Sequence, residues 1–502
     1  MFEDYHIVFK ERQFKKWAFK EAMGSLGEQE RIKRPHVVVF PCPGQGHMNP
    51  LMEFAKRLAY RNLHVTFIVT ERVKKQIIQA REGADAHVQL PNIKIETISD
   101  GLSSDCEETK DVDMIIDLLR KVGGLAFERL IERLNSQGDT VSCIVYDSLM
   151  SWIPHIANKF KVPSAFFWTQ SCAVYSIYYH FYTGMVKANN EEENVRAVIE
   201  IPGLPQLCQS DMPSFLQSSN PYGSLLQLVM NQFSTISQAT WILGNSFNEL
   251  EMREIQYMDS LIPIRTVGPL VPSAFIEGNN PQDQDVGIHL WKAENCIEWL
   301  NTKEASTVVY VSFGSLAILS KEQIIEIAIG LRNSRHSFLW VIRPDQKNEE
   351  NTNVDDFLKD FLQETIDQGL VVSWCPQMAV LNHPSVGMFV THCGWNSTLE
   401  SLCSGLPVLT FSQWSDQTTN SKYVEEVWKT GIRLNKTTHG LVGRDEVEKS
   451  IKTITESEQG VEMRKNALQW KTLAKDAMMK GGSSDKNIDW FIHEVIATIA
   501  MA

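Results

Sequence analysis

The segment from Trp374 to Gln417 constrains this chain more than any other part of it. An apolar run, Val386–Val390, leads into a loop that contains a glycine, and the apolar residues then change from the period of a strand to that of a helix. Leu399 falls on the inward face of that helix, and Gly405 follows its end as a stop signal. The segment therefore predicts a strand, a tight turn and a helix, with further strands before and after them.

The start of this helix is predicted to bind an anion. Gly394 permits a close turn, and Asn396 and Ser397 stand where the helix opens. Free backbone N–H groups and the positive end of the helix dipole favour an anion at such a place. His392, Asn396 and Ser397 add side-chain donors at the same point, so the site suits a diphosphate.

The remaining polar and aromatic residues of the segment fit a nucleotide sugar. Trp374 follows a predicted strand, Leu370–Ser373, and offers a ring for stacking on a base, and Gln377 offers an amide. Glu400 lies one helical turn beyond the helix start and can accept hydrogen bonds from ribose hydroxyls. Asp416 and Gln417 are expected to close the third strand, where a carboxylate and an amide suit sugar hydroxyls. Taken singly, a tryptophan or a histidine is more often part of a core. The occurrence of all these residues together, in this order, favours a nucleotide-sugar site instead.

The segment resembles the signature box of plant-type UDP-glycosyltransferases, and its 44 residues match the length of that box. W-x-P-Q, H-P-x-V-G, H-C-G-W-N-S-x-x-E and the closing D-Q all stand in place. Ser412 departs from the pattern, since many members carry a proline there, and we expect only a softer turn. The residues expected to contact a UDP-sugar are Thr169, Ser315, Trp374, Cys375, Gln377, His392, Trp395, Asn396, Ser397, Glu400, Asp416 and Gln417.

The first half of the chain opens with a βαβ unit. His36–Phe40 is an apolar strand typical of a parallel sheet, the glycines after it form a tight turn that holds His47, and Pro50 stands at the expected helix start. A dinucleotide-binding interpretation remains open: the turn reads G-x-G-x-x-N, without the third glycine, and Glu71 ends the second strand where a ribose-binding acid would lie. That interpretation leaves His47 unexplained.

Strands and helices go on alternating, which predicts a doubly wound parallel sheet. Asp147 follows one of these strands, at the edge where such sheets bind ligands. On its own residues it is equally suited to cap the next helix, Ser151–Phe160. The family resemblance implies that His47 is the catalytic base and that Asp147 orients it. The other predicted elements are strands at His64–Thr70, Ile93–Ile98, Cys143–Tyr146, Ala165–Trp168, Thr240–Asn245 and Arg265–Leu270, and a helical run at Asp113–Leu134.

Residues 170–235 are rich in aromatic side chains, and we expect ordinary packing for many of them and an aromatic acceptor pocket for others. The polar, acidic stretch Pro272–Val286 reads as a linker. Two D-x-D sequences, beginning at Asp111 and Asp283, are expected to be surface features rather than metal ligands, because neither follows a strand.

The second half repeats the alternation. The predicted elements are a strand at Val308–Phe313, a turn at Gly314-Ser315, a helix opened by a capping box from Ser320 to Gln323, a strand at Phe338–Ile342 and a helix at Met463–Met479. The resemblance implies the GT-B architecture, an α/β fold of two Rossmann-like doubly wound parallel-sheet domains facing across a cleft. The expected parts are a disordered N-terminal extension (1–34), an acceptor-binding domain (35–271), a linker (272–286), a UDP-sugar-binding domain (287–480) and a last helix that packs back on the first domain (481–502).

Composition excludes several classes of protein. The net charge of −13 argues against nucleic acid as a partner, and 43% hydrophobic with 22% charged residues is typical of a globular protein. Nine cysteines without a C-x-x-C pair indicate a reducing compartment. No apolar run reaches the ~18 residues of a membrane span. We therefore expect a cytoplasmic protein. We also expect it to be a monomer.

The resemblance implies inverting transfer of glucose from UDP-glucose to a hydroxyl or carboxylate of a small hydrophobic acceptor, such as a phenolic, flavonoid, terpenoid or hormone. No metal or other cofactor is expected. In the family, Trp395 and Gln417 accompany glucose transfer, and Asp416 would repel the carboxylate of a glucuronate. The alternatives are a non-catalytic UDP-sugar-binding protein and, third, an NAD-linked oxidoreductase.

Overall fold

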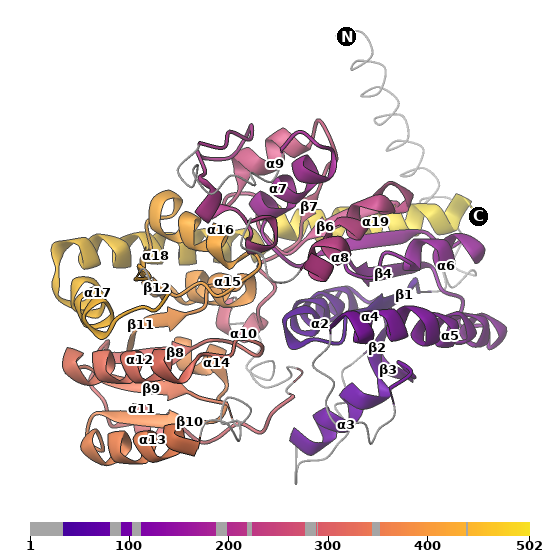
Figure 1. Cartoon of the computed structure of the whole chain (residues 1–502). Coiled ribbons are helices and arrows are strands. Elements are labelled where there is room, and N and C mark those ends of the chain that lie inside the picture. Colours follow the sequence, from indigo (N-terminus) through magenta and orange to yellow (C-terminus); the bar gives the residue numbers. More distant parts are fainter. Residues whose placement is uncertain are drawn as a thin grey trace.

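The computed structural model describes residues 34–80, 92–102, 112–186, 198–217, 223–276, 288, 290–343, 352–437 and 440–501. Two lobes, each with a parallel sheet and helices on its faces, lie side by side (Figure 1). The predicted N-terminal extension, apart from Arg34, and residues 277–286 of the predicted linker lie outside the described residues. Among the described residues, no helix combines the length and the apolar character that crossing a membrane requires.

The first lobe contains a seven-stranded sheet in the order β3-β2-β1-β4-β5-β6-β7, with every recorded strand pair parallel. Its central strands are rich in β-branched and aromatic residues and are buried along their length, as expected when helices cover both faces. The strands are β1 (His36–Phe40), β2 (His64–Thr70), β3 (Ile93–Ile98), β4 (Cys143–Asp147), β5 (Ser164–Trp168), β6 (Trp241–Gly244) and β7 (Arg265–Thr266).

The helix after β1 differs from the prediction. It begins at Gln45, after Gly44, so that His47 lies in its first turn and Pro50 lies inside the helix rather than at its start. The predicted helical run Asp113–Leu134 is divided by a π-helical turn at Leu119–Gly123. The helices of this lobe are α2 (Gln45–Tyr60), α3 (Glu71–Ala80), α4 (Val112–Leu118), α5 (Gly124–Ser136), α6 (Ile153–Lys159), α7 (Cys172–Tyr182), α8 (Gly223–Ser234) and α9 (Met252–Met258). The short helix α10 (Ser273–Ile276) follows them, within the predicted linker, and contacts helices of the second lobe.

The second lobe contains a six-stranded parallel sheet in the order β10-β9-β8-β11-β12-β13. The predicted pair of doubly wound, Rossmann-like sheets is therefore confirmed. The strands are β8 (Val308–Ser312), β9 (Ser337–Val341), β10 (Gly369–Val372), β11 (Val386–Thr391), β12 (Val408–Thr410) and β13 (Gly431–Arg433). The helices are α11 (Ile297–Asn301), α12 (Lys321–Ser334), α13 (Thr352–Glu364), α14 (Gln377–Leu381), α15 (Trp395–Ser404), α16 (Gln417–Lys422), α17 (Arg444–Glu456), α18 (Glu458–Met478) and α19 (Ser483–Met501).

The capping box predicted at α12 is only half formed. The Ser320 hydroxyl accepts from the backbone N–H of Gln323 at 3.2 Å, as expected. The Gln323 side chain does not reach back to Ser320 but bonds to both the carbonyl and the N–H of Val442, each at 2.9 Å. Val442 is buried, so its backbone groups need partners inside the protein, and the glutamine amide supplies both.

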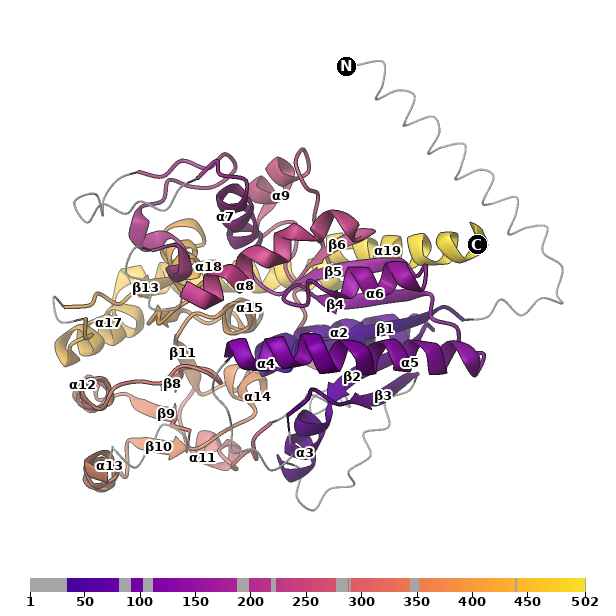
Figure 2. The same cartoon turned by 45° about the vertical axis from the view of Figure 1, so that its right-hand side comes forward.

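The last helix, α19, extends from the second lobe across the first (Figure 1 and Figure 2). Arg61, the residue after α2, forms ion pairs with Asp485 and Asp489, and the Asn487 amide donates to the Thr266 carbonyl at 2.8 Å. The rings of Phe54 and Phe491 pack with their centroids 5.8 Å apart. The C-terminal helix therefore joins the two lobes by packing on the first.

A loop of the first lobe also docks on the second. Thr418 and Thr419 donate to the carbonyls of Met212 and Asp211, each at 2.7 Å. The buried carboxylate of Asp211 accepts a hydrogen bond from Arg433 of β13 at 2.8 Å. These contacts hold the two lobes facing each other, so that the carboxyl ends of both sheets border one cleft.

Candidate functional site

A cavity of about 340 Å³ lies between the lobes, within the range of about 300–1,000 Å³ that is usual for small-ligand sites. The first lobe contributes the start of α2 and the loops after β5 and β6, and the second contributes the loops after β8, β10, β11 and β12. Every residue predicted to contact a UDP-sugar borders this cavity, and so does His47. Asp147 lies behind His47, away from the cavity wall.

His47 and Asp147 form a hydrogen-bonded pair. Nδ1 of His47 lies 2.7 Å from Oδ2 of Asp147, and because a carboxylate only accepts, Nδ1 carries the proton. Oδ1 of Asp147 also accepts from the backbone N–H of Leu149, so the aspartate orders the turn after β4 rather than capping α6, which begins at Ile153. The Thr169 hydroxyl lies 3.3 Å from the same ring nitrogen. The proton on Nδ1 leaves Nε2 of His47 with its lone pair.

The environment raises the pKa of His47 above its usual value. Burial by itself lowers this pKa, because it disfavours the imidazolium ion. The charge and hydrogen bond of Asp147 raise it by more, and the charge of Asp416 adds to them. A histidine held in this way can take up a proton while its other nitrogen stays fixed on a carboxylate.

The start of α15, where the sequence predicts an anion site, faces the cavity. The helix begins at Trp395 with Gly394 before it, and Asn396 and Ser397 lie in its first turn, facing the cavity. The His392 ring lies between two glycines: a Cβ on Gly314 would come within 2.6 Å of the ring and one on Gly394 within 2.5 Å. Both positions therefore need glycine, because the imidazole occupies the space of a side chain.

Burial lowers the pKa of His392 to about 4, and the nearby Arg343 contributes to the shift. His392 is consequently neutral at physiological pH and offers one N–H donor without a charge. Arg343 is a further residue of this region, which no sequence motif indicated. Its side chain is 1% exposed and donates to the carbonyls of Gly314 and Ala317, at 2.5 and 2.9 Å. It fixes the loop that carries Ser315. One feature of the sequence could have indicated Arg343: it comes just after a predicted strand, at the carboxyl edge of the sheet, where such sheets bind ligands.

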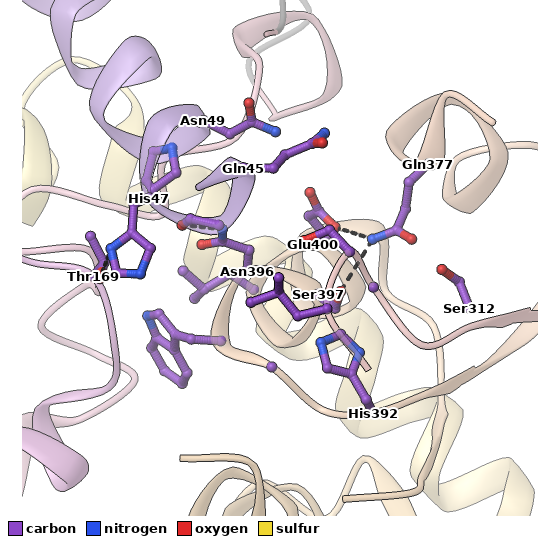
Figure 3. Close-up of a pocket in the computed structure, with 18 of the residues that line it drawn as sticks. Gln45, His47, Asn49, Thr169, Ser312, Gln377, His392, Asn396, Ser397 and Glu400 are labelled. Atoms are coloured by element: carbon purple, nitrogen blue, oxygen red, sulfur yellow. Dashed lines mark hydrogen bonds between the residues drawn. The ribbon is translucent and has the colours of Figure 1, made fainter. Parts of the chain in front are cut away.

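Gln377 connects Glu400, which is expected to bind the ribose, with Ser397, which is expected at the diphosphate. Its amide nitrogen donates to Glu400 at 2.5 Å and to the Ser397 hydroxyl at 3.2 Å, and its oxygen accepts from the hydroxyl of Tyr310 at 3.0 Å. Burial raises the pKa of Glu400 to about 7, and the Gln377 amide opposes this shift. Figure 3 shows Gln377, Glu400 and His392 on one side of the pocket and His47 with Thr169 on the other.

Trp374 is half-buried at the cavity wall and packs against Trp291, with ring centroids 4.7 Å apart. A hydrogen bond connects the segment that carries Trp291 with Trp374, since the backbone N–H of Glu294 donates to the Trp374 carbonyl at 2.9 Å. Cys375 is buried, and its sulfur lies 3.3 Å from the hydroxyl of Tyr310, so it mainly packs behind the wall. Trp291 and Tyr310 were not predicted from the sequence, because both lie outside the 44-residue segment.

Trp395 borders the cavity, but its polar atom is already used. The side chain is 3% exposed, and its indole N–H donates across the cleft to the carbonyl of Asn245 at 2.6 Å. The amide of the next residue, Asn396, donates to the carbonyl of Gly46 at 2.7 Å. Two consecutive residues of α15 therefore donate hydrogen bonds to the first lobe, and the sequence did not predict these contacts.

Asp416 and Gln417 do not close a strand as predicted. β12 ends at Thr410, and the two residues begin α16 instead. Burial raises the pKa of Asp416 to about 6, while Asn420 donates to its carboxylate at 2.6 Å. The side-chain oxygen of Gln417 accepts from the N–H groups of Gln413 and Trp414, at 2.8 and 3.1 Å. Gln417 thus orders the loop before α16 and leaves only its amide N–H groups for a ligand.

Gln45 and Asn49, one helical turn apart on α2, also border the cavity, and both are labelled in Figure 3. Their buried side-chain oxygens have no hydrogen-bond partner among the described residues. These amides were not predicted, because the sequence of this stretch indicates only a turn and a helix start.

The aromatic stretch from Cys172 to Tyr182 forms a helix, α7, rather than a cavity lining. Tyr175 and Tyr178 are fully buried and pack edge-on against Trp168, and Tyr175 also packs against Phe233 of α8. No residue of α7 borders the cavity. Since burial of a whole aromatic face stabilises the lobe, ordinary packing explains this stretch.

Three described side chains that could share a metal ion lie together, His36, His64 and Asp139. The Nδ1 atoms of both histidines lie 3.1 Å from one carboxylate oxygen of Asp139, and hydrogen bonds account for this arrangement. His36 and His64 begin β1 and β2, at the edge of the sheet opposite the cavity. Asp111, Asp283 and Asp285 of the D-x-D sequences lie outside the described residues.

Comparisons with known proteins match both lobes to one kind of enzyme. The family model described as "UDP-glucoronosyl and UDP-glucosyl transferase" matches residues 252–493, and "Glycosyltransferase, N-terminal domain" matches residues 34–201. UDP-glycosyltransferase 74E1 of Arabidopsis thaliana is 38% identical, over 91% of this chain and 98% of its own. Gallate 1-beta-glucosyltransferase 84A23 of Punica granatum is 39% identical, over 92% of this chain and 90% of its own. The crystal structure of Os79 from O. sativa with UDP superposes with a TM-score of 0.82 at 30% identity, covering 91% of this chain and all of that one.

Proposed function

Because the chain belongs to the plant-type UDP-glycosyltransferase family, with its GT-B fold, we propose that it transfers glucose from UDP-glucose to a small hydrophobic acceptor, inverting the anomeric carbon. One observation carries the proposal. The His47–Asp147 pair and the start of α15 face each other across one cavity, so that a base and an anion site flank the space for a sugar.

His47 is the proposed base. Asp147 holds its proton on Nδ1, and Nε2 accepts the proton of an acceptor hydroxyl as the acceptor oxygen attacks the sugar. The same aspartate stabilises the imidazolium ion that forms, as the acid does in hydrolase triads. Its carboxylate already favours that ion in the free protein, because it raises the pKa of His47.

The start of α15 is the proposed site of the diphosphate. Negative charge grows on this leaving group as the glycosidic bond breaks, and preorganised N–H donors stabilise it without reorganisation. Asn396, Ser397 and neutral His392 supply the donors, and buried Arg343 adds a positive charge behind the Ser315 loop. With the base and the leaving group on opposite sides of the sugar, a single displacement inverts the configuration.

The residues around Gln377 are proposed to hold the uridine. Trp374 supplies a ring for the base, and Glu400 supplies a carboxylate for the ribose hydroxyls. The amide of Gln417 and the carboxylate of Asp416, which border the cavity, are proposed to bind sugar hydroxyls, with Thr169 on the side of the first lobe. An uncharged hexose suits this subsite, because none of the residues that border the described cavity is a lysine or an arginine.

The proposed acceptor carries a hydroxyl or a carboxylate. A hydroxyl needs His47 as a base, whereas a carboxylic acid, with a pKa near ~4, arrives ionised. The pomegranate relative is by its name a gallate 1-beta-glucosyltransferase, which supports carboxylates as acceptors here. A screen of phenols, flavonoids, terpenoids and aromatic acids with UDP-glucose decides which small hydrophobic molecules are acceptors. Mass spectrometry detects the glucosides that form.

The competing proposal is a non-catalytic UDP-sugar-binding protein. It predicts UDP binding in calorimetry without UDP release in the presence of any acceptor of the screen. Turnover that is lost in His47→Ala, with UDP affinity retained, would support the transferase. The anomeric configuration of the product, read from its proton NMR coupling constant, tests inversion.

We further propose that the transfer needs no metal ion, because the start of α15 and the residues around it provide for the diphosphate charge. Activity should then survive EDTA, and a loss of activity that Mn²⁺ restores would contradict this.

The proposed monomer rests on the cavity, which one chain encloses with residues of both lobes; light scattering tests it. The proposed cytoplasmic location rests on the cysteine pattern, and a fluorescent fusion tests it.

A further inference from the structure

The carbonyl of Gly46, in the first turn of α2, accepts a hydrogen bond from the other lobe. Its donor is Nδ2 of Asn396, 2.7 Å away, at the start of α15. Gly46 immediately precedes His47, and Asn396 stands at the proposed diphosphate site. The bond therefore connects the backbone beside the base with the helix that faces the leaving group.

Pro50 explains why this carbonyl is available. In an α-helix the carbonyl of residue i accepts from the N–H of residue i+4, and for Gly46 that residue is Pro50, which has no N–H. A proline inside a helix is ordinarily costly, and here it lies inside α2, buried at the cavity wall. The sequence thus removes the regular donor of one carbonyl, and that carbonyl is the one that Asn396 contacts.

The amide of Asn396 can serve two partners. An amide nitrogen carries two N–H groups, so one can donate to Gly46 while the other donates to a diphosphate. The neighbouring Trp395 already ties the same helix start to Asn245 of the first lobe, at 2.6 Å. The second bond, at Asn396, is the one that acts next to His47.

We propose that Pro50 and Asn396 together are positioning residues: Pro50 leaves the Gly46 carbonyl free, and Asn396 uses it to fix His47 relative to the diphosphate site. The inference rests on the proposed function for its effect on transfer. The bond itself does not depend on that function, and this allows the two to be tested separately.

The experiment is a double-mutant cycle of Pro50→Ala and Asn396→Ala in the full-length protein, read in kcat with a phenol acceptor, in the Kd of UDP and in Tm. Pro50→Ala restores an N–H to the helix, so that Gly46 gains an internal donor that competes with Asn396. We expect kcat to fall roughly three- to tenfold, the usual effect of losing one hydrogen bond, with the Kd of UDP changed less than about twofold. When Asn396→Ala is already present, Pro50→Ala should leave kcat nearly unchanged.

Pro154→Ala is the matched control. Pro154 stands at the start of α6, where the missing N–H has no helical acceptor in any case, so this change frees or occupies no carbonyl within the helix. It should leave kcat unchanged. A loss of kcat in Pro50→Ala that is equally large with and without Asn396 would overturn the inference, because it would show that the proline ring acts through its own packing.

The Tm readings test the bond even if the wild-type protein transfers no glucose. Asn396→Ala should lower Tm more in the protein that retains Pro50 than in the Pro50→Ala variant, and additive shifts would contradict the inference. Wild-type protein that neither binds UDP nor releases it from UDP-glucose would instead contradict the proposed function. The two failures are therefore distinguishable.

Discussion

Nδ1 of His47 donates a hydrogen bond to Asp147 across 2.7 Å, although the two residues lie 100 positions apart in the chain. His47 comes from the first turn of α2 and Asp147 from the end of β4, which pairs directly with β1. Because β1 and β4 are parallel neighbours, the segments that follow them emerge at the same edge of the sheet. The pair is thus a consequence of strand order.

His47→Ala should reduce kcat on a phenol acceptor roughly 10²–10⁴-fold, the usual contribution of a positioned base. On an aromatic acid the loss should be distinctly smaller, because the acid arrives ionised. Steady-state rates of the mutant with one acceptor of each kind measure both effects. Equal losses on the two acceptors would mean that His47 does more than take a proton, and no loss on the phenol would remove it from the mechanism.

The pH dependence should differ between the two acceptors. His47 accepts a proton only when neutral, and its pKa is raised, so kcat/KM for a phenol should fall as the pH drops through a value above the usual ~6.5 of histidine. For an aromatic acid the rate should not fall over the same interval. Asp147→Asn removes the main group that raises the pKa of His47. The remaining activity on the phenol should therefore begin to fall only at a lower pH than in the wild-type protein. A fall at the same pH would contradict this assignment.

Trp374→Ala should weaken donor binding by about 1–3 kcal/mol, by analogy with base–aromatic stacking. Trp291→Ala should weaken it by less, because Trp291 contacts the Trp374 ring and not the cavity. Calorimetry with UDP measures both affinities. Trp490→Ala is the control, because Trp490 lies on α19, where its ring contacts the Arg265 guanidinium. An unchanged affinity in Trp374→Ala would show that this ring only packs.

UDP-glucose should be a much better donor than UDP-glucuronate. The pKa of Asp416 is raised to about 6, which still leaves its carboxylate mostly ionised at neutral pH, where it repels a second carboxylate on the sugar. The discrimination in kcat/KM should therefore shrink in Asp416→Asn, and it should also shrink as the pH falls below about 6. Comparable turnover of both donors by the wild-type enzyme would refute the argument.

Gly387→Ala should lower the free energy of unfolding by about 1–3 kcal/mol, as overpacking does. Gly387 lies in β11, where the pairing with β8 is irregular, and a Cβ there would overlap the backbone carbonyl of Ser306. Gly124→Ala is the control, because its Cβ would meet only ordinary contacts, 3.7 Å or more away, at the start of α5. Urea unfolding of the two variants decides whether this glycine is there for close packing.

Much of the site was predictable because its determinants are local. The change of apolar period after Val390 and the glycine before Trp395 place the start of α15 correctly, and buried apolar runs such as His36–Phe40 place the strands. Alternation of strands and helices then specifies two parallel sheets. Each of these inferences depends on residues within about one turn or one strand of each other, which the chain cannot separate.

Other features could not be predicted because their partners are distant in the sequence. The indole N–H of Trp395 is directed to Asn245, 150 positions earlier, and Arg343 reaches back to the loop of Gly314. Nothing in the residues around Tyr175 distinguished a buried helix from a cavity lining, because the same rings suit both. Only the packing of α7 against α8 decided this.

The sequence by itself determined which chemical groups this protein brings to a nucleotide sugar: a histidine after a glycine turn, a helix start rich in donors, and a carboxylate and amide nearby. Only the tertiary structure decided which atoms of those groups are free. Gln417 uses its oxygen to hold Gln413, and Asn396 uses one N–H to hold Gly46. The physical reason is that hydrogen bonds saturate: each donor or acceptor taken by a distant partner is unavailable to a ligand, and the identity of that partner depends on the whole fold.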